Sequence, residues 1–142
     1  MKHLDTKQAA IPAIGRILLA AIFIISGFGK VMAPAGTIGY IESSGLPFAT
    51  IAFAVAVAVE LGGGLLLVAG IKTRFVAAIL AAFSVVTAFA FHGAVGDQNQ
   101  MIHLLKNIAM AGGLLQVVAF GAGAWSVDAL GERKAPRQAV RA

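Results

Sequence analysis

Six polar or charged side chains stand inside otherwise apolar stretches of this sequence, and chemistry is expected at these positions. They are Arg16, Lys30, Glu60, His92, Lys106 and Asn107. The stretch AFAVAVAVELGGGLLLVAGIKTR begins at Ala52, and Glu60 is the one residue among its first nineteen that is neither apolar nor glycine. Charged groups at bilayer depth are costly and are rare unless they are paired or functional. The sequence therefore predicts that Glu60 faces a partner inside the protein.

Depth along the helices indicates which basic residue that partner is. At 1.5 Å per residue, Glu60 lies ~16 Å and Arg16 ~7 Å from the inner interface, while Lys30 and Lys106 lie ~5 Å from the outer surface. A snorkelling side chain can close the remaining ~9 Å gap to Arg16, whereas the gap to either lysine is ~14 Å. We therefore predict an Arg16–Glu60 pair with two hydrogen bonds. The alternative is that the pair only fixes the order of the helices.

The other polar residues gather toward the opposite membrane surface. Lys30, Lys106, Asn107 and His92, together with His103, are predicted to line an outward-facing pocket for a polar or redox-active head group. The alternative for Lys30 is that it snorkels alone to the lipid headgroups. Two histidines can begin a metal site, but no third ligand has suitable spacing, so no metal is predicted.

The elements that position these residues are four apolar segments. They are about Ile11–Ala33, Pro47–Gly70, Phe75–His92 and Ile102–Gly121, each near the ~20 residues that a helix needs to cross a bilayer. The chain of 142 residues is 59% hydrophobic and 12% charged, whereas a soluble domain has about a quarter of its residues charged. Open sheets are excluded in lipid, so the fold class is all-α, an integral membrane four-helix bundle.

The distribution of basic residues predicts the orientation of this bundle. Nine of the eleven Lys and Arg residues fall before the first span or near its start, in the second connection or after the fourth span. This asymmetry predicts that both termini are cytoplasmic. Residues 1–130 form the four-span domain, and residues 131–142 form a basic cytoplasmic tail that contacts anionic lipid. The basic residues follow no single soluble face, so nucleic acid is not a predicted partner.

Small residues predict which faces of the second span meet other helices. Ala52, Ala56, Glu60 and Gly64 form one line at every fourth position, and Ala54, Ala58 and Gly62 form a second line beside it. Such lines allow close approach of helices in membranes. An alternative for the first span is a cleaved signal peptide, but the run is too long and Arg16 and Lys30 interrupt it.

Several short motifs resemble the DoxX family of small four-helix membrane proteins, over about residues 15–128. They are SGxGK (from Ser26), GLP (from Gly45), ELxGG (from Glu60), TR (from Thr73), KN (from Lys106) and WSxD (from Trp125). The resemblance departs in one place, since Ala124 precedes the tryptophan where typical members have arginine or leucine.

The resemblance implies a bacterial inner-membrane protein and an accessory role in a quinone-linked redox system or in oxidative or electrophile stress. Relatives include a subunit of a thiosulfate:quinone oxidoreductase and members linked to superoxide dismutase. The chain has no cysteine, no Gly-rich nucleotide turn on a βαβ unit and no haem motif. Electrons would therefore pass through a bound quinone or through a soluble or membrane oxidoreductase partner. The role as an oxidoreductase subunit is implied by the resemblance only. The alternatives are a non-catalytic membrane scaffold and a small-solute transporter, and a homo-oligomer is left open.

Overall fold

The computed structural model describes residues 6–94 and 96–134, and helices make up nearly all of this part of the chain. The helices are α1 (Thr6–Met32), α2 (Pro34–Ser43), α3 (Ala49–Val57), the π-helical turn η1 (Ala58–Gly62), α4 (Gly63–Ala69), α5 (Thr73–His92), α6 (Gln98–Phe120) and α7 (Val127–Lys134). No strand occurs among the described residues. The all-α prediction is therefore confirmed.

Four of these segments are long and apolar enough to cross a membrane, as the sequence predicts. They run over Ala9–Met32, Ala49–Ala69, Thr73–His92 and Gln98–Phe120. The second is composite, because α3, η1 and α4 follow one another without a break. The predicted boundaries differ from these by a few residues at most.

Local sequence explains where the first span ends and why a second, short helix begins directly after it. Ala33 precedes Pro34, and the helical conformation is unfavourable for a residue before proline. Its φ of −136° and ψ of 61° lie outside the helical region. Pro34 then opens α2 at a position where its missing N–H costs nothing. Neither α2 nor α7 was predicted as a helix. Most of the predicted basic tail, residues 135–142, lies outside the described residues.

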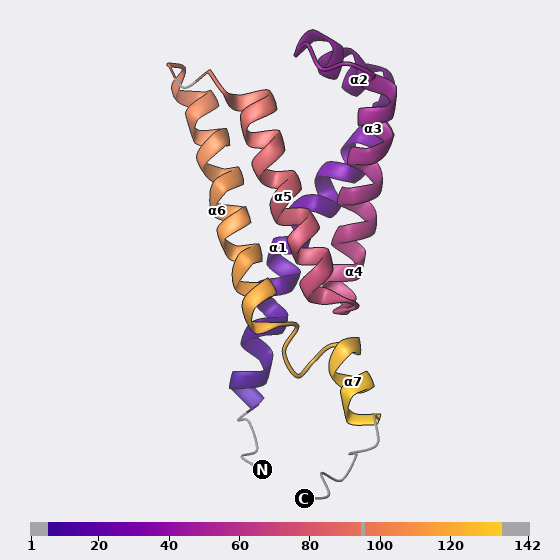
Figure 1. Ribbon diagram of the computed structural model, residues 1–142, viewed down its shortest axis with the longest axis vertical. Coiled ribbons are helices and arrows are strands. Elements are labelled where there is room, and N and C mark those ends of the chain that lie inside the picture. The colour runs from indigo at the N-terminus through magenta and orange to yellow at the C-terminus, as the bar shows by residue number, and fades with distance from the viewer. Residues whose placement is uncertain (1–5, 95, 135–142) are drawn as a thin grey trace, which may run out of the picture.

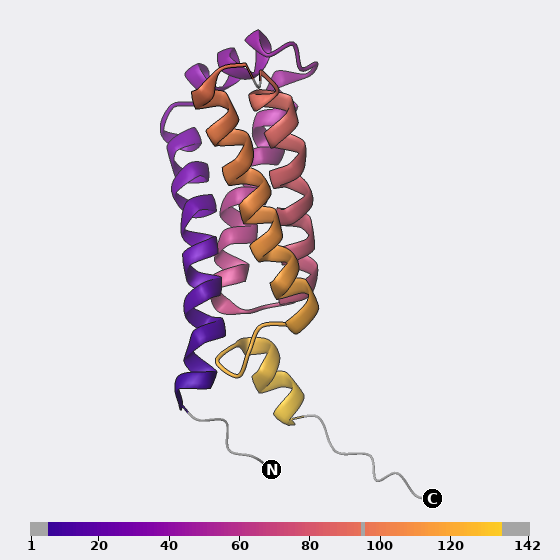
Figure 2. The same cartoon turned by 90° about the vertical axis from the view of Figure 1, so that its left-hand side faces the viewer.

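The spans form two pairs that converge at one end in Figure 1, whereas in the turned view of Figure 2 they run in roughly the same direction. We call the end where they converge the terminal end, because α1 and α5 begin there and α4 and α6 end there. The opposite end, which carries α2 and the α5–α6 connection, is the distal end. Helices α5 and α6 pack along their length, and α1 packs on η1 and α4. The pair α5–α6 diverges from α1 and α3 toward the distal end (Figure 1).

The packing of α1 on η1 depends on a close approach at Gly27. A Cβ atom at this position would lie 2.8 Å from Leu61 Cγ and 3.1 Å from Glu60 Cβ. Only glycine leaves room for that contact, which holds Glu60 against α1. Ala56, Glu60 and Gly64 of the first predicted line are buried and Ala52 is half-buried, as predicted, but Ala54, Ala58 and Gly62 of the second line are exposed. That second line faces outward, because the second span packs on α1 and α5 through its other faces.

Candidate functional site

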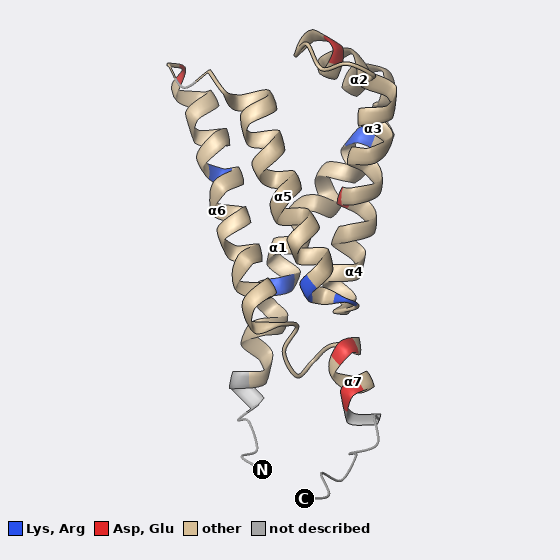
Figure 3. Ribbon diagram, in the orientation of Figure 1, with Lys and Arg blue, Asp and Glu red and all other residues tan. Residues whose placement is uncertain are grey.

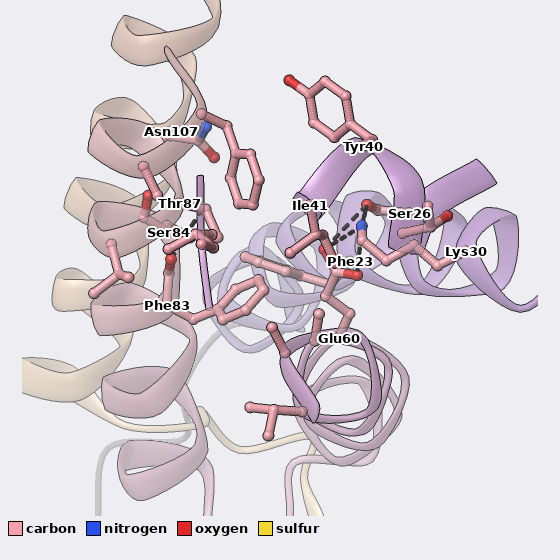
Figure 4. Close-up of a pocket in the computed structure, with 18 of the residues that line it drawn as sticks. Phe23, Ser26, Lys30, Tyr40, Ile41, Glu60, Phe83, Ser84, Thr87 and Asn107 are labelled. Carbon is pink, nitrogen blue, oxygen red and sulfur yellow. Dashed lines mark hydrogen bonds and ion pairs between the residues drawn. The ribbon is translucent and has the colours of Figure 1, made fainter. Parts of the chain in front are cut away.

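Glu60 forms an ion pair with Lys30 of α1. Lys30 Nζ lies 2.8 Å from Glu60 Oε2 and 3.1 Å from Oε1. Ser26, one turn before Lys30, donates its hydroxyl hydrogen to Oε1 at 3.0 Å and accepts a hydrogen bond from Lys30 Nζ at 2.8 Å. These three residues, which we call the Ser26–Lys30–Glu60 cluster, therefore bind one another, and Glu60 Oε2 makes the ion-pair contact with Lys30 but accepts no hydrogen bond from the described residues (Figure 4).

Side-chain direction explains why Lys30 reaches Glu60 despite their separation along the bundle. Side chains of a helix lean toward its N-terminus. Lys30 on α1 therefore leans toward the terminal end, and Glu60 on the antiparallel second span leans toward the distal end. The two side chains lean toward each other, and the long lysine stem closes the gap that a count of backbone rises leaves open. Glu60 is 5% exposed and the Lys30 side chain is 25% exposed, so the carboxylate lies inside the protein and the lysine is only partly buried.

The predicted Arg16–Glu60 pair is wrong. The Arg16 side chain leans toward the terminal end, away from Glu60, for the reason just given. Its guanidinium donates to three backbone carbonyl oxygens, those of Ala122, Val68 and Trp125. The contacts with Val68 and Trp125 measure 3.2 Å and 2.9 Å. The alternative that Lys30 snorkels alone is also wrong, since Lys30 is the counter-charge of Glu60.

Arg16 belongs to a second polar assembly, the terminal clasp, formed by Arg16 with residues 121–128. Its other charged member is Asp128 of α7, whose carboxylate accepts hydrogen bonds from the amides of Lys72 and Thr73, each at 2.8 Å. These amides stand at the start of α5, where a helix favours negative charge. Lys and Arg gather at this end of the bundle (Figure 3). The clasp thus joins α1, α4, α5 and the segment that follows α6.

The pKa of Asp128 reflects this arrangement. Partial burial of the carboxyl raises its pKa, but the hydrogen bonds from Thr73 and Lys72 and the charge of Arg16 lower it more. The pKa of Asp128 therefore lies below its ordinary value of 3.8. The carboxylate is ionised at neutral pH, as its capping role requires.

A cavity of about 760 Å³ lies beside the Ser26–Lys30–Glu60 cluster, in the part of the bundle where the helix pairs diverge (Figure 4). Residues of α1, α2, α3, η1, α5 and α6 line it. Apolar side chains such as Phe23, Ile41 and Phe83 supply most of the wall. Val55 of α3 and Val86 of α5 line the cavity and are also 53% and 65% exposed, so its edge reaches the lipid-facing surface between these helices.

The wall opposite the cluster carries Ser84 and Thr87 of α5 and Asn107 of α6 (Figure 4). Ser84 donates its hydroxyl hydrogen to Leu80 O at 2.8 Å, and the Thr87 hydroxyl lies 2.9 Å from Phe83 O and 3.1 Å from Ser84 O. Both hydroxyls therefore donate within their own helix, and their oxygens stay free to accept.

Two aromatic contacts lie toward the distal end of the cavity. Tyr40 of α2 stacks on Phe91 of α5, with ring centroids 5.6 Å apart. His92 stacks on His103 of α6 at 4.9 Å, and its Nδ1 lies 2.8 Å from Gln100 Oε1. Within residues 6–94 and 96–134, no three His, Asp or Glu side chains come together as a group that would hold a metal ion.

The structure thus brings four of the six sequence-predicted residues to one cavity and leaves two outside it. Lys30, Glu60, His92 and Asn107 line the cavity, whereas Arg16 belongs to the clasp. Lys106 is exposed on α6 and does not line the cavity. The adjacent positions point about 100° apart, so only one of Lys106 and Asn107 can face inward.

Sequence reasoning missed Ser26, Ser84 and Thr87. Ser26 carried a signal, because it opens the SGxGK motif and stands four residues before Lys30, on the same helix face. Ser84 and Thr87 carried none, since hydroxyl residues are common in membrane helices, where they hydrogen-bond the preceding turn.

Comparison with known proteins places the chain among its relatives. The DoxX family model matches residues 11–93, more than half of the chain. The chain belongs to the DoxX family. It is 36% identical over 121 residues to the inner membrane protein YqjF of Escherichia coli K12, covering 85% of this chain and 92% of the relative. It is 37% identical over 122 residues to the inner membrane protein YphA of the same organism, covering 81% and 86%. No solved structure matches this DoxX-family chain at a significant level.

The motifs that carry the family resemblance coincide with the two polar assemblies. SGxGK and ELxGG supply Ser26, Lys30 and Glu60, which meet at the cavity wall. WSxD supplies Trp125 O to Arg16 and the Asp128 carboxylate to the start of α5. Ser126 of that motif donates to Gly123 O at 2.8 Å and accepts from Ala129 N at 3.1 Å, so it shapes the turn into α7. In this DoxX-family protein, the motifs therefore build a cavity wall and a clasp.

Proposed function

We propose that this protein binds a membrane-dissolved quinone in its cavity and serves as the accessory membrane subunit of a quinone-linked redox or oxidative-stress system. The observation that carries the proposal is the cavity, which is mainly apolar and has a few polar groups on facing walls. Its volume of about 760 Å³ falls within the range of about 300–1,000 Å³ that is usual for small-molecule sites.

The position of the cavity supports a ligand that comes from the lipid. Val55 and Val86 stand at its edge on the outer surface of α3 and α5. A molecule dissolved in the hydrocarbon can pass between these helices without crossing an aqueous phase. Phe23, Ile41 and Phe83 offer an apolar bed for a flat ring, and aromatic side chains pack favourably on such rings. A quinone combines a flat ring with carbonyl oxygens and an apolar tail.

The role as an accessory subunit follows from the composition of the chain. There is no cysteine, so no thiol of this chain carries electrons. A redox partner, soluble or membrane-bound, supplies electrons to the bound quinone, and this chain supplies the site. The scaffold alternative requires no ligand in the cavity, and the transporter alternative requires that the ligand also leaves at the terminal end.

The binding test uses two matched substitutions on α5. Ala90 lines the cavity, whereas Ala82 faces outward on the same helix. We expect purified wild-type protein and Ala82→Trp to retain a radiolabelled short-chain quinone in detergent, and Ala90→Trp to lose it. Equal retention by both tryptophan variants would refute the site, and no retention by the wild type would refute quinone binding.

We further propose that the protein lies in the bacterial inner membrane with both termini in the cytoplasm. The bias of basic residues supports this orientation, and both relatives are named inner membrane proteins. The chain has no cysteine, so single cysteines can be placed at Ser43, Gln98 and Gln138. An impermeant thiol reagent added to spheroplasts should label positions 43 and 98 and spare 138. Labelling of position 138 alone would show that the protein has the opposite orientation.

A further inference from the structure

The charges that line the cavity cancel. Lys30 and Glu60 form an ion pair, and no other Lys, Arg, Asp or Glu of the described residues lines the cavity. A ligand with a net charge would enter a poorly solvated site without a counter-charge, which is strongly unfavourable. The electrostatics of the cavity therefore select an uncharged ligand.

Most hydrogen-bond donors of the cavity wall are already committed. The Ser26 hydroxyl and the Lys30 ammonium donate within the Ser26–Lys30–Glu60 cluster. The Ser84 and Thr87 hydroxyls donate to carbonyls of α5. A ligand carbonyl that approached any of these groups would compete with an existing bond. It would gain little, because one hydrogen bond would be exchanged for another.

Asn107 is the exception in the middle of the cavity. Its amide lies on the α6 side, facing the cluster across the cavity, and forms no hydrogen bond with any other described residue (Figure 4). The side chain is half-buried. An amide offers two N–H donors and one acceptor, so it can bind a carbonyl oxygen without breaking another bond. Tyr40 and His92 also carry polar groups and line the cavity, but they lie toward its distal end, and Tyr40 is 52% exposed.

We infer that the cavity selects an uncharged carbonyl compound and that the Asn107 amide, by donating to the ligand's carbonyl oxygen, is the specificity-determining group. This inference rests on the proposed quinone binding and identifies the side chain that distinguishes a quinone from a hydrocarbon of the same shape. The Ser26–Lys30–Glu60 cluster is then a neutral wall that excludes charged ligands rather than the group that holds the ring.

The experiment compares two flat ligands of similar size, naphthoquinone and naphthalene, on purified protein in lipid nanodiscs. We expect the wild type to prefer naphthoquinone. Asn107→Leu should weaken naphthoquinone binding about tenfold, the effect of one hydrogen bond of ordinary strength, and leave naphthalene binding unchanged. Lys106→Met is the matched control, because the neighbouring residue lies outside the cavity and should change neither affinity. Unchanged naphthalene binding also shows that the Asn107→Leu cavity is intact.

Two further measurements complete the test. Asn107→Asp replaces the donor by an acceptor and should lose the preference for naphthoquinone as Asn107→Leu does. An anionic naphthoquinone sulfonate should bind the wild type at least tenfold more weakly than naphthoquinone itself. An unchanged naphthoquinone preference in Asn107→Leu would overturn the role of Asn107 and leave quinone binding standing. Equal affinity for the sulfonate would overturn the charge selection, and failure of the wild type to bind naphthoquinone would overturn the proposed function as well.

Discussion

Removal of one partner from the Lys30–Glu60 pair should have unequal effects, depending on which charge remains. Lys30→Met leaves the Glu60 carboxylate, whose side chain is 7% exposed, with only the Ser26 hydroxyl as a partner. Glu60→Gln leaves Lys30, whose side chain is 25% exposed and stands near the end of α1, where it can snorkel. The carboxylate therefore has the less solvated position of the two.

The expected magnitudes depend on these exposures. Removing one partner of a fully buried pair costs about 3–5 kcal/mol, whereas solvent-exposed pairs contribute about 0.2–1 kcal/mol. We expect Lys30→Met to lower the free energy of unfolding by about 3 kcal/mol and Glu60→Gln by about 1 kcal/mol. The double variant holds no lone charge, so its loss should be smaller than the sum of the single losses by about 2 kcal/mol.

Unfolding in mixed micelles with increasing SDS, followed by circular dichroism, measures these differences. Lys106→Met removes an exposed lysine and serves as the control, with an expected change within about 0.5 kcal/mol. A larger loss for Glu60→Gln than for Lys30→Met would refute the reasoning from burial. Additive losses in the double variant would refute the pair itself.

Three further predictions concern packing and the terminal clasp, and each is checked by the same unfolding measurement. Arg16→Lys should lower stability by about 1–3 kcal/mol, because an ammonium cannot reproduce the guanidinium contacts with three carbonyls, whereas Arg74→Lys at an exposed position should change little. Gly27→Ala should lower stability by about 1–3 kcal/mol because its Cβ would meet Leu61, whereas Gly29→Ala, with no atom within 4 Å, should not. The lowered pKa of Asp128 stabilises the fold at neutral pH and ceases to do so as the pH falls below about 4 through the folded-state pKa, so Asp128→Asn should remove part of the acid sensitivity.

Each of these three predictions has an outcome that contradicts it. Equal stability of the wild type and Arg16→Lys would show that the carbonyl contacts contribute nothing. A Gly29→Ala loss as large as that of Gly27→Ala would attribute the effect to the helix backbone rather than to the contact with Leu61. A pH profile of Asp128→Asn that parallels the wild type would mean that other carboxyls determine acid unfolding.

The transmembrane fold could be predicted from the sequence because each of its signals is local. The apolar runs, Pro34 after the first span and the small residues around Glu60 act within one helix or one turn. The short helix α2 was missed, because a segment of ten residues with glycine at positions 36 and 39 carries a weak signal.

The partners of the buried charges could not be predicted, because they depend on relations between helices. Counting 1.5 Å rises from an assumed interface places Lys30 and Glu60 far apart, since it ignores the lean of both side chains and the length of the lysine stem. The same count ignored backbone carbonyls as acceptors for Arg16, two of which come from residues 106 and 109 positions later in the chain. The role of Ser84 and Thr87 in lining the cavity could not be predicted either, because it depends on how α5 and α6 lie relative to α1.

The long sequence separation within the terminal clasp has a consequence for how the protein is made. Arg16 belongs to α1, which leaves the ribosome before the other described helices, but Ala122 and Trp125 follow all four spans and are synthesised much later. During insertion, Val68 O is the only one of the three acceptors available to the guanidinium until the segment after α6 has been made. A chain that stops after α6 keeps all four spans and still lacks two of the three acceptors for this cation. The clasp thus gives a finished protein a stability that a truncated one lacks, and quality-control proteases that sample partly unfolded membrane proteins can discriminate between the two.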